Sequence, residues 1–197
     1  MKLYLATWLC LVIAASAFAA GGNKPAGAAK PAKPSAGAVD AKANKETVAC
    51  IENFKRADPE MAGWFDVAAG YAVFYSVTKG AAGIGAARGD GEVFEKGKLI
   101  GTATLTQITL GLQLGGQEFA EIIFFETKEA LDEFINGKAA MSAQTSAVIA
   151  AEGASADAKY QQGVVVFTMA KGGLMFEASL GGQKFKFTPL QKPVPAK

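Results

Sequence analysis

The feature that most constrains the fold is a change in hydrophobic period at residue 71. From there to residue 189, apolar and polar residues alternate over most of the chain, and glycines, often in pairs, interrupt the alternation. A period of two is the pattern of β-strands, and glycine-rich interruptions are typical of tight turns. The strands are expected at 71–77, 82–88, 91–95, 98–114, 117–125, 143–151, 162–169, 173–180 and 183–188.

Three segments keep a helical period instead. Residues 46–57 repeat apolar side chains at helical spacing, and 58–69 open with an aspartate-proline pair that is typical of a helix start. Gly70 is expected to be the left-handed cap of this second helix. A third helix is predicted at 127–136, where Gly137 stops it. The fold class is therefore α+β: a single domain with a curved, mostly antiparallel sheet packed against two or three helices.

Composition sets the domain boundaries. Residues 1–19 have a positive start, an apolar stretch and an A-x-A end, which predict a cleaved signal peptide, with a retained membrane anchor as the alternative. Residues 20–45 are rich in Lys, Ala, Pro and Gly and are expected to be a disordered linker. The folded domain is expected at 46–190, followed by a tail at 191–197. The chain is thus predicted to be exported, either periplasmic or secreted.

Charge is distributed unevenly along the chain. The formal net charge is only +2, which argues against a nucleic-acid partner. Residues 20–45 carry five lysines against one aspartate, whereas residues 46–197 carry 14 basic and 17 acidic residues. The linker could be an electrostatic tether to an anionic membrane, at about 1 kcal/mol per lysine, or simply a solvating spacer.

Little in the sequence points to catalysis. The chain has no histidine, which removes the histidine-dependent nucleophiles and metal sites, and no cofactor or metal is expected. The run 83–89 resembles a dinucleotide loop, but its third glycine position is Arg88 and no helix is predicted after it. Glu118 and Glu121 have the odd spacing that puts them on opposite faces of a strand. Cys50 has no histidine to activate it, so the protein is predicted not to be an enzyme.

Part of the chain repeats. The run Leu114-Gly115-Gly116-Gln117-Glu118-Phe119 matches Leu180-Gly181-Gly182-Gln183-Lys184-Phe185, and Val-Phe pairs at 73–74 and 166–167 each precede a Lys-Gly pair. These similarities indicate a quasi-repeat. The alternative is that antiparallel hairpins have similar sequences because few residue types suit their turns. Lys79 and Lys171 occupy equivalent positions in it, and both are expected in glycine-rich turns together with Arg88. Backbone amides in such turns can approach a phosphate, while a turn residue kept for solubility is the alternative.

Ordered motifs run through the same region. They are Gly70-Tyr71-Ala72-Val73-Phe74, Val77-Thr78-Lys79-Gly80, Gly83-Ile84-Gly85, Arg88-Gly89, Gly91, Thr106-Gln107, Gly111-Leu112-Gln113-Leu114-Gly115-Gly116-Gln117, Glu121-Ile122-Ile123-Phe124-Phe125, Gly153-Ala154-Ser155-Ala156, Val166-Phe167, Lys171-Gly172-Gly173-Leu174 and Gly181-Gly182. Together they resemble the SYLF domain, a lipid-binding module related to yeast actin-binding proteins, and most closely its exported bacterial members. Tyr75 departs from the proline that the family often has there, and the lipoprotein box of some bacterial members is absent.

The resemblance implies non-enzymatic binding of anionic phospholipids, with phosphoinositides as the ligands of eukaryotic members. It also implies an N-terminal amphipathic helix that contacts lipid, here 46–57, with Lys55 and Arg56 beside its apolar face. An ordinary helix packed on the sheet is the alternative for this segment. The predicted lipid-binding residues are Lys79, Arg88, Lys171, Lys55 and Arg56. The partner is then an anionic membrane surface with the protein peripheral on it, and the competing function is an envelope or secreted scaffold that binds a protein.

Overall fold

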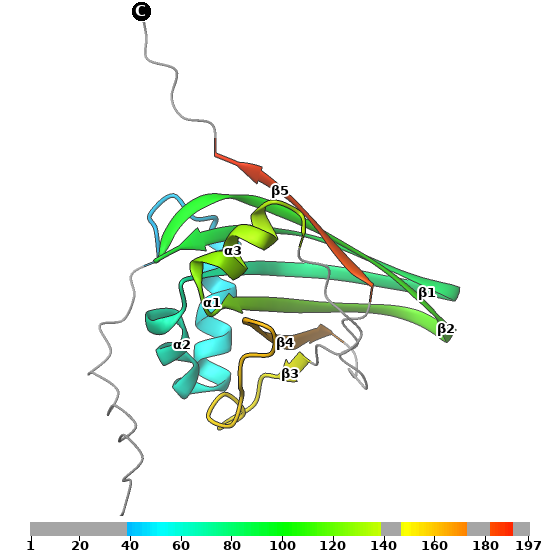
Figure 1. Cartoon of the computed structure of the whole chain (residues 1–197). Helices are drawn as coiled ribbons and strands as arrows, with labels where there is room; N and C mark the ends of the chain where they lie inside the picture. Colours follow the sequence, from blue (N-terminus) through cyan, green and yellow to red (C-terminus); the bar gives the residue numbers. More distant parts are fainter. Residues whose placement is uncertain (1–38, 139–146, 173–181, 191–197) are drawn as a thin grey trace, which may run out of the picture. The chain divides into compact units, whose positions relative to one another are not determined.

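The architecture is that of a computed structural model, which describes residues 39–138, 147–172 and 182–190 (Figure 1). All of them belong to one compact unit, residues 31–197. The expected signal peptide, most of the expected linker, the C-terminal tail and the strand predicted at 173–180 lie outside the described residues.

Helices and one sheet make up the described chain, which confirms the α+β class. The helices are α1 (Lys45–Ala57), the 3-10 turn η1 (Pro59–Met61), α2 (Ala62–Val67) and α3 (Lys128–Ile135). The strands are β1 (Gly70–Glu95), β2 (Lys98–Phe125), β3 (Ala147–Ile149), β4 (Val164–Gly172) and β5 (Gln183–Pro189). The sheet order is β1-β2-β4-β3, with β5 paired to another part of β2, and only the β3–β4 pair is parallel.

Two very long strands replace most of the short ones that were expected. The three strands predicted between 71 and 95 are the single strand β1, and the two predicted between 98 and 125 are the single strand β2. The β1–β2 pairing continues without a shift through the turns predicted at 78–81 and 89–90, and its irregularities, between Phe74 and Val77 and between Ala82 and Ile84, fall within predicted strands. The prediction of separate strands was wrong, because glycines inside a strand can mark bulges and close approaches as well as turns.

β1 folds back on itself, and two glycines make this possible. A Cβ atom added at Gly91 would lie 2.4 Å from the carbonyl oxygen of Val73, and one at Gly89 would lie 2.8 Å from that of Ser76. No side chain fits between two backbones at that distance. Glycine is therefore required where the second half of β1 crosses its first half.

The folded-back hairpin and the helices enclose two hydrophobic cores. The inner core holds residues from both halves of the hairpin together with β5 and α3, and the helix-side core lies between the sheet and α1 with α2. Members of the inner core include Phe74, Val77, Val93, Leu105, Phe119, Ile123, Phe134 and Phe185. Members of the helix-side core include Ile51, Phe54, Met61, Tyr71, Val73, Ile122, Phe124 and Phe167. The sheet is therefore covered by apolar contacts on both faces over its central part.

The helices form nearly where they were predicted. α1 begins after Asn44, whose side chain accepts a hydrogen bond from the Glu46 amide, and its apolar face packs in the helix-side core. Gly70, however, does not cap α2, because α2 ends at Val67 with an extended cap at Ala68. Gly70 instead begins β1, where a Cβ would lie 2.6 Å from the Phe94 carbonyl oxygen.

The ordered chain also starts earlier than expected. Asp40 accepts a hydrogen bond from the Leu99 amide at 3.1 Å, and the Asn44 amide donates to the Glu92 carboxylate at 3.0 Å. These contacts hold residues 39–44 against the β1–β2 hairpin. The prediction that the disordered linker extends to residue 45 was therefore wrong at its C-terminal end.

Gly91→Ala tests whether the strand crossing is as tight as the structure shows. We expect it to lower the free energy of unfolding by roughly 1–3 kcal/mol, because the added methyl group overpacks the contact with Val73. Gly80→Ala is the matched control in the same strand, since a Cβ at Gly80 meets no atom within 4 Å. Urea denaturation of both variants measures the difference, and equal stabilities would show that the two halves of β1 are not in contact.

Candidate functional site

The three basic residues expected in turns all lie in strands. Lys79 and Arg88 belong to β1, opposite Gln117 and Thr106 of β2, and Lys171 belongs to β4. The prediction that glycine-rich turns present these side chains was wrong, because the neighbouring glycines continue the strands. Backbone amides that pair within a sheet are not free to form a phosphate-binding turn.

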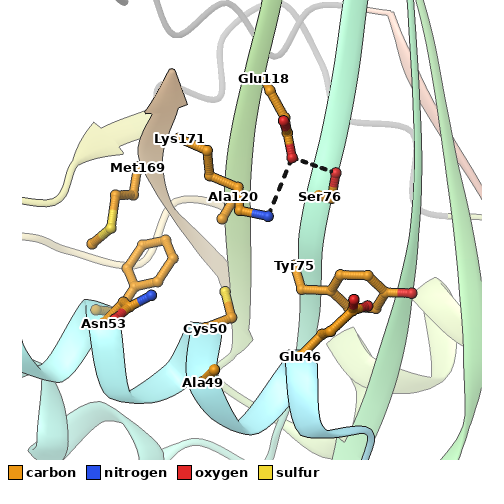
Figure 2. Close-up of a pocket in the computed structure, with 11 residues that line it drawn as sticks. Glu46, Ala49, Cys50, Asn53, Tyr75, Ser76, Glu118, Ala120, Met169 and Lys171 are labelled. Atoms are coloured by element: carbon orange, nitrogen blue, oxygen red, sulfur yellow. Dashed lines mark hydrogen bonds and ion pairs between the residues drawn. The ribbon is translucent and has the colours of Figure 1, made fainter. Parts of the chain in front are cut away.

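The structure does not bring Lys79 and Lys171 together. Lys79 is only 8% exposed and follows Val77 on the inner-core face of the sheet. Lys171 lies on the helix-side face, where its ammonium group contacts the Glu118 carboxylate at 3.2 Å (Figure 2). The two halves of the quasi-repeat therefore present their lysines to opposite sides of one sheet.

The two basic residues of α1 have contacts of their own. The Lys55 ammonium lies 4.6 Å from the centroid of the Phe65 ring, and the Arg56 guanidinium donates to the Asn53 side chain at 2.8 Å. The apolar face of α1 is buried, with Ile51 and Phe54 in the helix-side core. α1 thus packs as an ordinary sheet-covering helix, which was the alternative left open for this segment.

Arg88 lies on a different surface, which the sequence did not reveal. Register places Arg88 of β1 opposite Thr106 of β2, and Thr106 opposite Lys184 of β5. One row further along, Asp90, Thr104 and Lys186 are aligned in the same way. Because strands are spaced by about 4.8 Å, Arg88 and Lys184 are separated by roughly 10 Å at their backbones. We call the outward positions of 86–90, 102–108 and 184–188 the outer face.

The outer face is basic and well exposed. Arg88, Lys184 and Lys186 are all exposed, and within the described ranges none of them forms an ion pair. The one carboxylate at these positions, Asp90, accepts a hydrogen bond from Thr104. Ile108 stands at the end of the same face and is 69% exposed. Three cations, threonines and one exposed apolar side chain therefore share a surface.

A polar cluster is buried on the other side of the sheet, facing the inner core. Glu121 is fully buried, and its carboxylate accepts a hydrogen bond from the Gln183 amide group at 3.0 Å. The remaining oxygens of Glu121 and Gln183 and the hydroxyl of Thr168, which is opposite Glu121 in β4, have no hydrogen-bond partner among the residues that the structure describes. Burial raises the pKa of Glu121 to about 7, an effect that the Gln183 hydrogen bond partly offsets.

Two other kinds of site, a metal centre and a membrane-spanning helix, are absent from the described residues. In the part of the chain that the structure describes, no group of three or more histidine, cysteine or carboxylate side chains could hold a metal ion. Over the same residues, no helix has the length and apolar character needed to cross a membrane. The thiol of Cys50 is buried, and burial raises its pKa to about 12, so it remains protonated at neutral pH.

Comparison with known proteins relates part of this chain to a family. Residues 106–188, from the middle of β2 through β5, match the model of the Ysc84 family, described as Las17-binding protein actin regulator. This part of the chain is similar to a SYLF domain. Beta cell expansion factor A of Aeromonas veronii is similar to the chain, with 29% identity over 128 residues that cover 61% of this chain and 46% of that protein. The chain thus spans less than half the length of this relative, and the SYLF resemblance predicted from the motifs is confirmed.

Sequence reasoning missed the residues that complete the outer face. Lys184 and Lys186 alternate with the buried Gln183 and Phe185 along β5, so their exposure could have been predicted from the strand period. Their proximity to Arg88 could not, because it depends on pairing between β5 and β2. Ile108 follows the threonines at 102, 104 and 106 at the same two-residue spacing. The strand period therefore places its apolar side chain on the outward side.

Glu121→Gln tests the buried carboxyl group. An acid whose pKa rises on folding stabilises the protein below its unfolded pKa and loses that contribution as pH rises through its folded pKa. The free energy of unfolding of the parent protein should therefore fall between about pH 4.5 and pH 7, by up to roughly 3 kcal/mol. Glutamine cannot ionise, so the variant should lack this decline and be the more stable protein at pH 8.

Urea denaturation across that pH range measures the decline in both proteins. Glu133→Gln, at an exposed position of α3, is the control for the charge change and should follow the parent protein. A Glu121→Gln variant that loses stability with pH as steeply as the parent would show that Glu121 is ionised throughout the range.

Proposed function

We propose that this chain binds anionic phospholipid surfaces reversibly and without catalysis. The observation that carries the proposal is the outer face, where Arg88 of β1 and Lys184 and Lys186 of β5 are exposed on either side of β2, without ion-pair partners among the described residues. The similarity of residues 106–188 to a family related to lipid and actin binding is consistent with it. The outer face contains one of the five residues predicted from sequence, Arg88.

The electrostatics of the outer face are sufficient for peripheral binding. Each lysine or arginine near an anionic membrane contributes about 1 kcal/mol, so three cations give roughly 3 kcal/mol before desolvation. Residues 46–197 are acidic overall, with 14 basic against 17 acidic residues. Attraction must therefore come from a local patch and not from the net charge of the domain.

Ile108 supplies the second contribution. Its side chain is 69% exposed at the end of the outer face, next to the exposed Ala86 in register. An exposed apolar residue beside cations is the combination that interfacial binding uses, because the apolar group enters the headgroup region while the cations meet the lipid phosphates. We propose that Ile108 makes this contact.

Export is part of the same proposal. The pattern of residues 1–19 supports a signal peptide that directs the chain to the periplasm or the exterior, where it would be peripheral on a membrane. Of the other predicted residues, Lys55 and Arg56 are near the α1–α2 junction and could add a second basic contact. Lys171 is engaged by Glu118 and Lys79 is buried, so neither is assigned a primary role.

A protein partner is the competing function. The description of the matching family as a Las17-binding protein actin regulator favours it. Salt distinguishes the two functions, because contacts between exposed charges and phosphates weaken as ionic strength rises, whereas an apolar protein interface persists.

The double variant Lys184→Gln, Lys186→Gln tests the outer face. We expect its partition coefficient onto vesicles with 30% phosphatidylserine to fall on the order of twentyfold, since two cations at about 1 kcal/mol each are removed. Co-sedimentation at low and moderate salt measures the loss, and zwitterionic vesicles give the background.

The control is Lys138→Gln, Lys159→Gln, which removes the same charge from exposed positions away from the outer face. Equal binding by the two double variants would contradict the assignment of the surface. If neither variant nor the parent protein binds anionic vesicles, the protein-partner function takes its place.

A further inference from the structure

A half-open groove lies between α1 and the sheet, separate from the outer face. It has a volume of about 390 Å³, and its walls come from α1, β1, β2 and β4 (Figure 2). The floor is apolar and consists of Cys50, Phe54, Ala120 and Met169, and the exposed Ala49 lies on the wall that α1 forms. A concave, largely apolar cavity of this size is typical of small-molecule sites, in which a few polar groups fix the orientation of the ligand.

One end of the groove is a closed ionic contact. The Glu118 carboxylate accepts hydrogen bonds from the Ser76 hydroxyl at 2.8 Å and from the Lys171 ammonium at 3.2 Å (Figure 2). These two hydrogen bonds lower the pKa of Glu118, so its carboxylate is ionised at neutral pH. The lysine in the groove is thus neutralised by a carboxylate within it.

The other end of the groove is acidic. Glu46 and Tyr75 both line it, and the Glu46 carboxylate has no ion pair or side-chain hydrogen bond among the residues described. Burial and then the charges of Glu46, Asp90 and Glu92 raise the pKa of Tyr75. The field at this aromatic ring is therefore negative, and an aromatic face in a negative field attracts cations.

We infer that the groove binds an organic cation: an ammonium group held by Glu46 and the Tyr75 ring, with an apolar chain along the floor beside Ala120 and Met169. The lining residues have a formal charge of −1, from Glu46 and Glu118 against Lys171. A cation meets an unpaired carboxylate there. An anion would first have to separate Lys171 from Glu118 and would leave that carboxylate without its partner.

Volume limits the size of the ligand. A water molecule occupies about 30 Å³ in the liquid, so the groove holds a molecule with about a dozen non-hydrogen atoms. Octyltrimethylammonium has about that size and the required chemistry, and octanoate provides a chain of the same length with the opposite charge. The groove shares no lining residue with the basic outer face.

The experiment titrates the whole protein, labelled at its methionine methyl groups, with octyltrimethylammonium and separately with octanoate. We expect saturable binding of the cation with a shift of the Met169 methyl resonance, and no such shift with octanoate. Glu46→Gln should weaken binding roughly three- to fivefold, the effect of losing one exposed cation contact. Ala49→Leu should abolish binding because an exposed position on the groove wall then fills the space.

Glu52→Gln is the matched control, with the same charge change at an exposed position of α1 that does not line this groove. The Lys184→Gln, Lys186→Gln protein should bind the cation normally, which separates this inference from the proposed lipid function. Phosphatidylcholine vesicles should shift the Met169 methyl resonance if the natural ligand is the head group of a bilayer lipid. They should leave the resonance unchanged if the natural ligand is a free molecule.

Three results would overturn the inference. The first is binding of octanoate as tight as that of the cation, and the second is equal affinity of the Glu46→Gln and Glu52→Gln proteins. The third is a saturating titration that leaves the Met169 resonance in place, because the cation would then bind elsewhere.

Discussion

Two backbone segments of β1, residues 73–77 and 89–91, touch because glycine leaves no side chain between them. A Cβ at Gly91 would lie 2.4 Å from the Val73 carbonyl oxygen. This contact lets one long hairpin fold back and enclose the inner core, with Phe74 and Val77 from its first half and Val93 from its second. The proposed lipid function depends on this crossing, because it turns one side of the second half of β1 inward and leaves the other side, the outer face, to solvent.

The alternation of side chains along each strand then determines which lysine side chains are exposed to solvent. Along β5, Gln183 and Phe185 point into the inner core, and Lys184 and Lys186 point outward. In the first half of β1, the irregularity between Phe74 and Val77 turns Val77 to the inner core, and Lys79 follows it there. Lysines that look alike in sequence therefore have different roles: exposed on the outer face, buried inside, or paired with Glu118 in the groove.

The sequence predicted what depends on local pattern. The helices at 46–57 and 127–136, the stop at Gly137 and the α+β class could all be found from periodicity and capping residues. The turn at 96–97 was predicted correctly, but those at 78–81, 89–90 and 115–116 were wrong, because a glycine needed for a backbone crossing, such as Gly89, has the same sequence signal as one needed for a turn. The outer face and the groove could not be found, since they depend on which strands pair and on where α1 lies.

The quasi-repeat shows the same limit. Val73 and Val166 begin its two copies, yet Val73 packs in the helix-side core and Val166 in the inner core. Similar segments on either side of β2 thus have opposite orientations, and the equivalence of Lys79 and Lys171 in sequence does not extend to space. The anionic-lipid hypothesis is retained on the strength of Arg88 and of two lysines that the sequence did not single out.

The most direct test of this account measures which surface meets the membrane. Ile108 and Val67 are 69% and 73% exposed, but only Ile108 is on the outer face, whereas Val67 ends α2. A nitroxide label on a cysteine introduced at each position, in a Cys10→Ser, Cys50→Ala background, reports its contact with oxygen dissolved in anionic vesicles by power-saturation electron paramagnetic resonance. The account predicts increased oxygen contact for the label at 108 and an aqueous signal for the label at 67. The reverse result, or an aqueous signal at both positions in vesicle-bound protein, would contradict it.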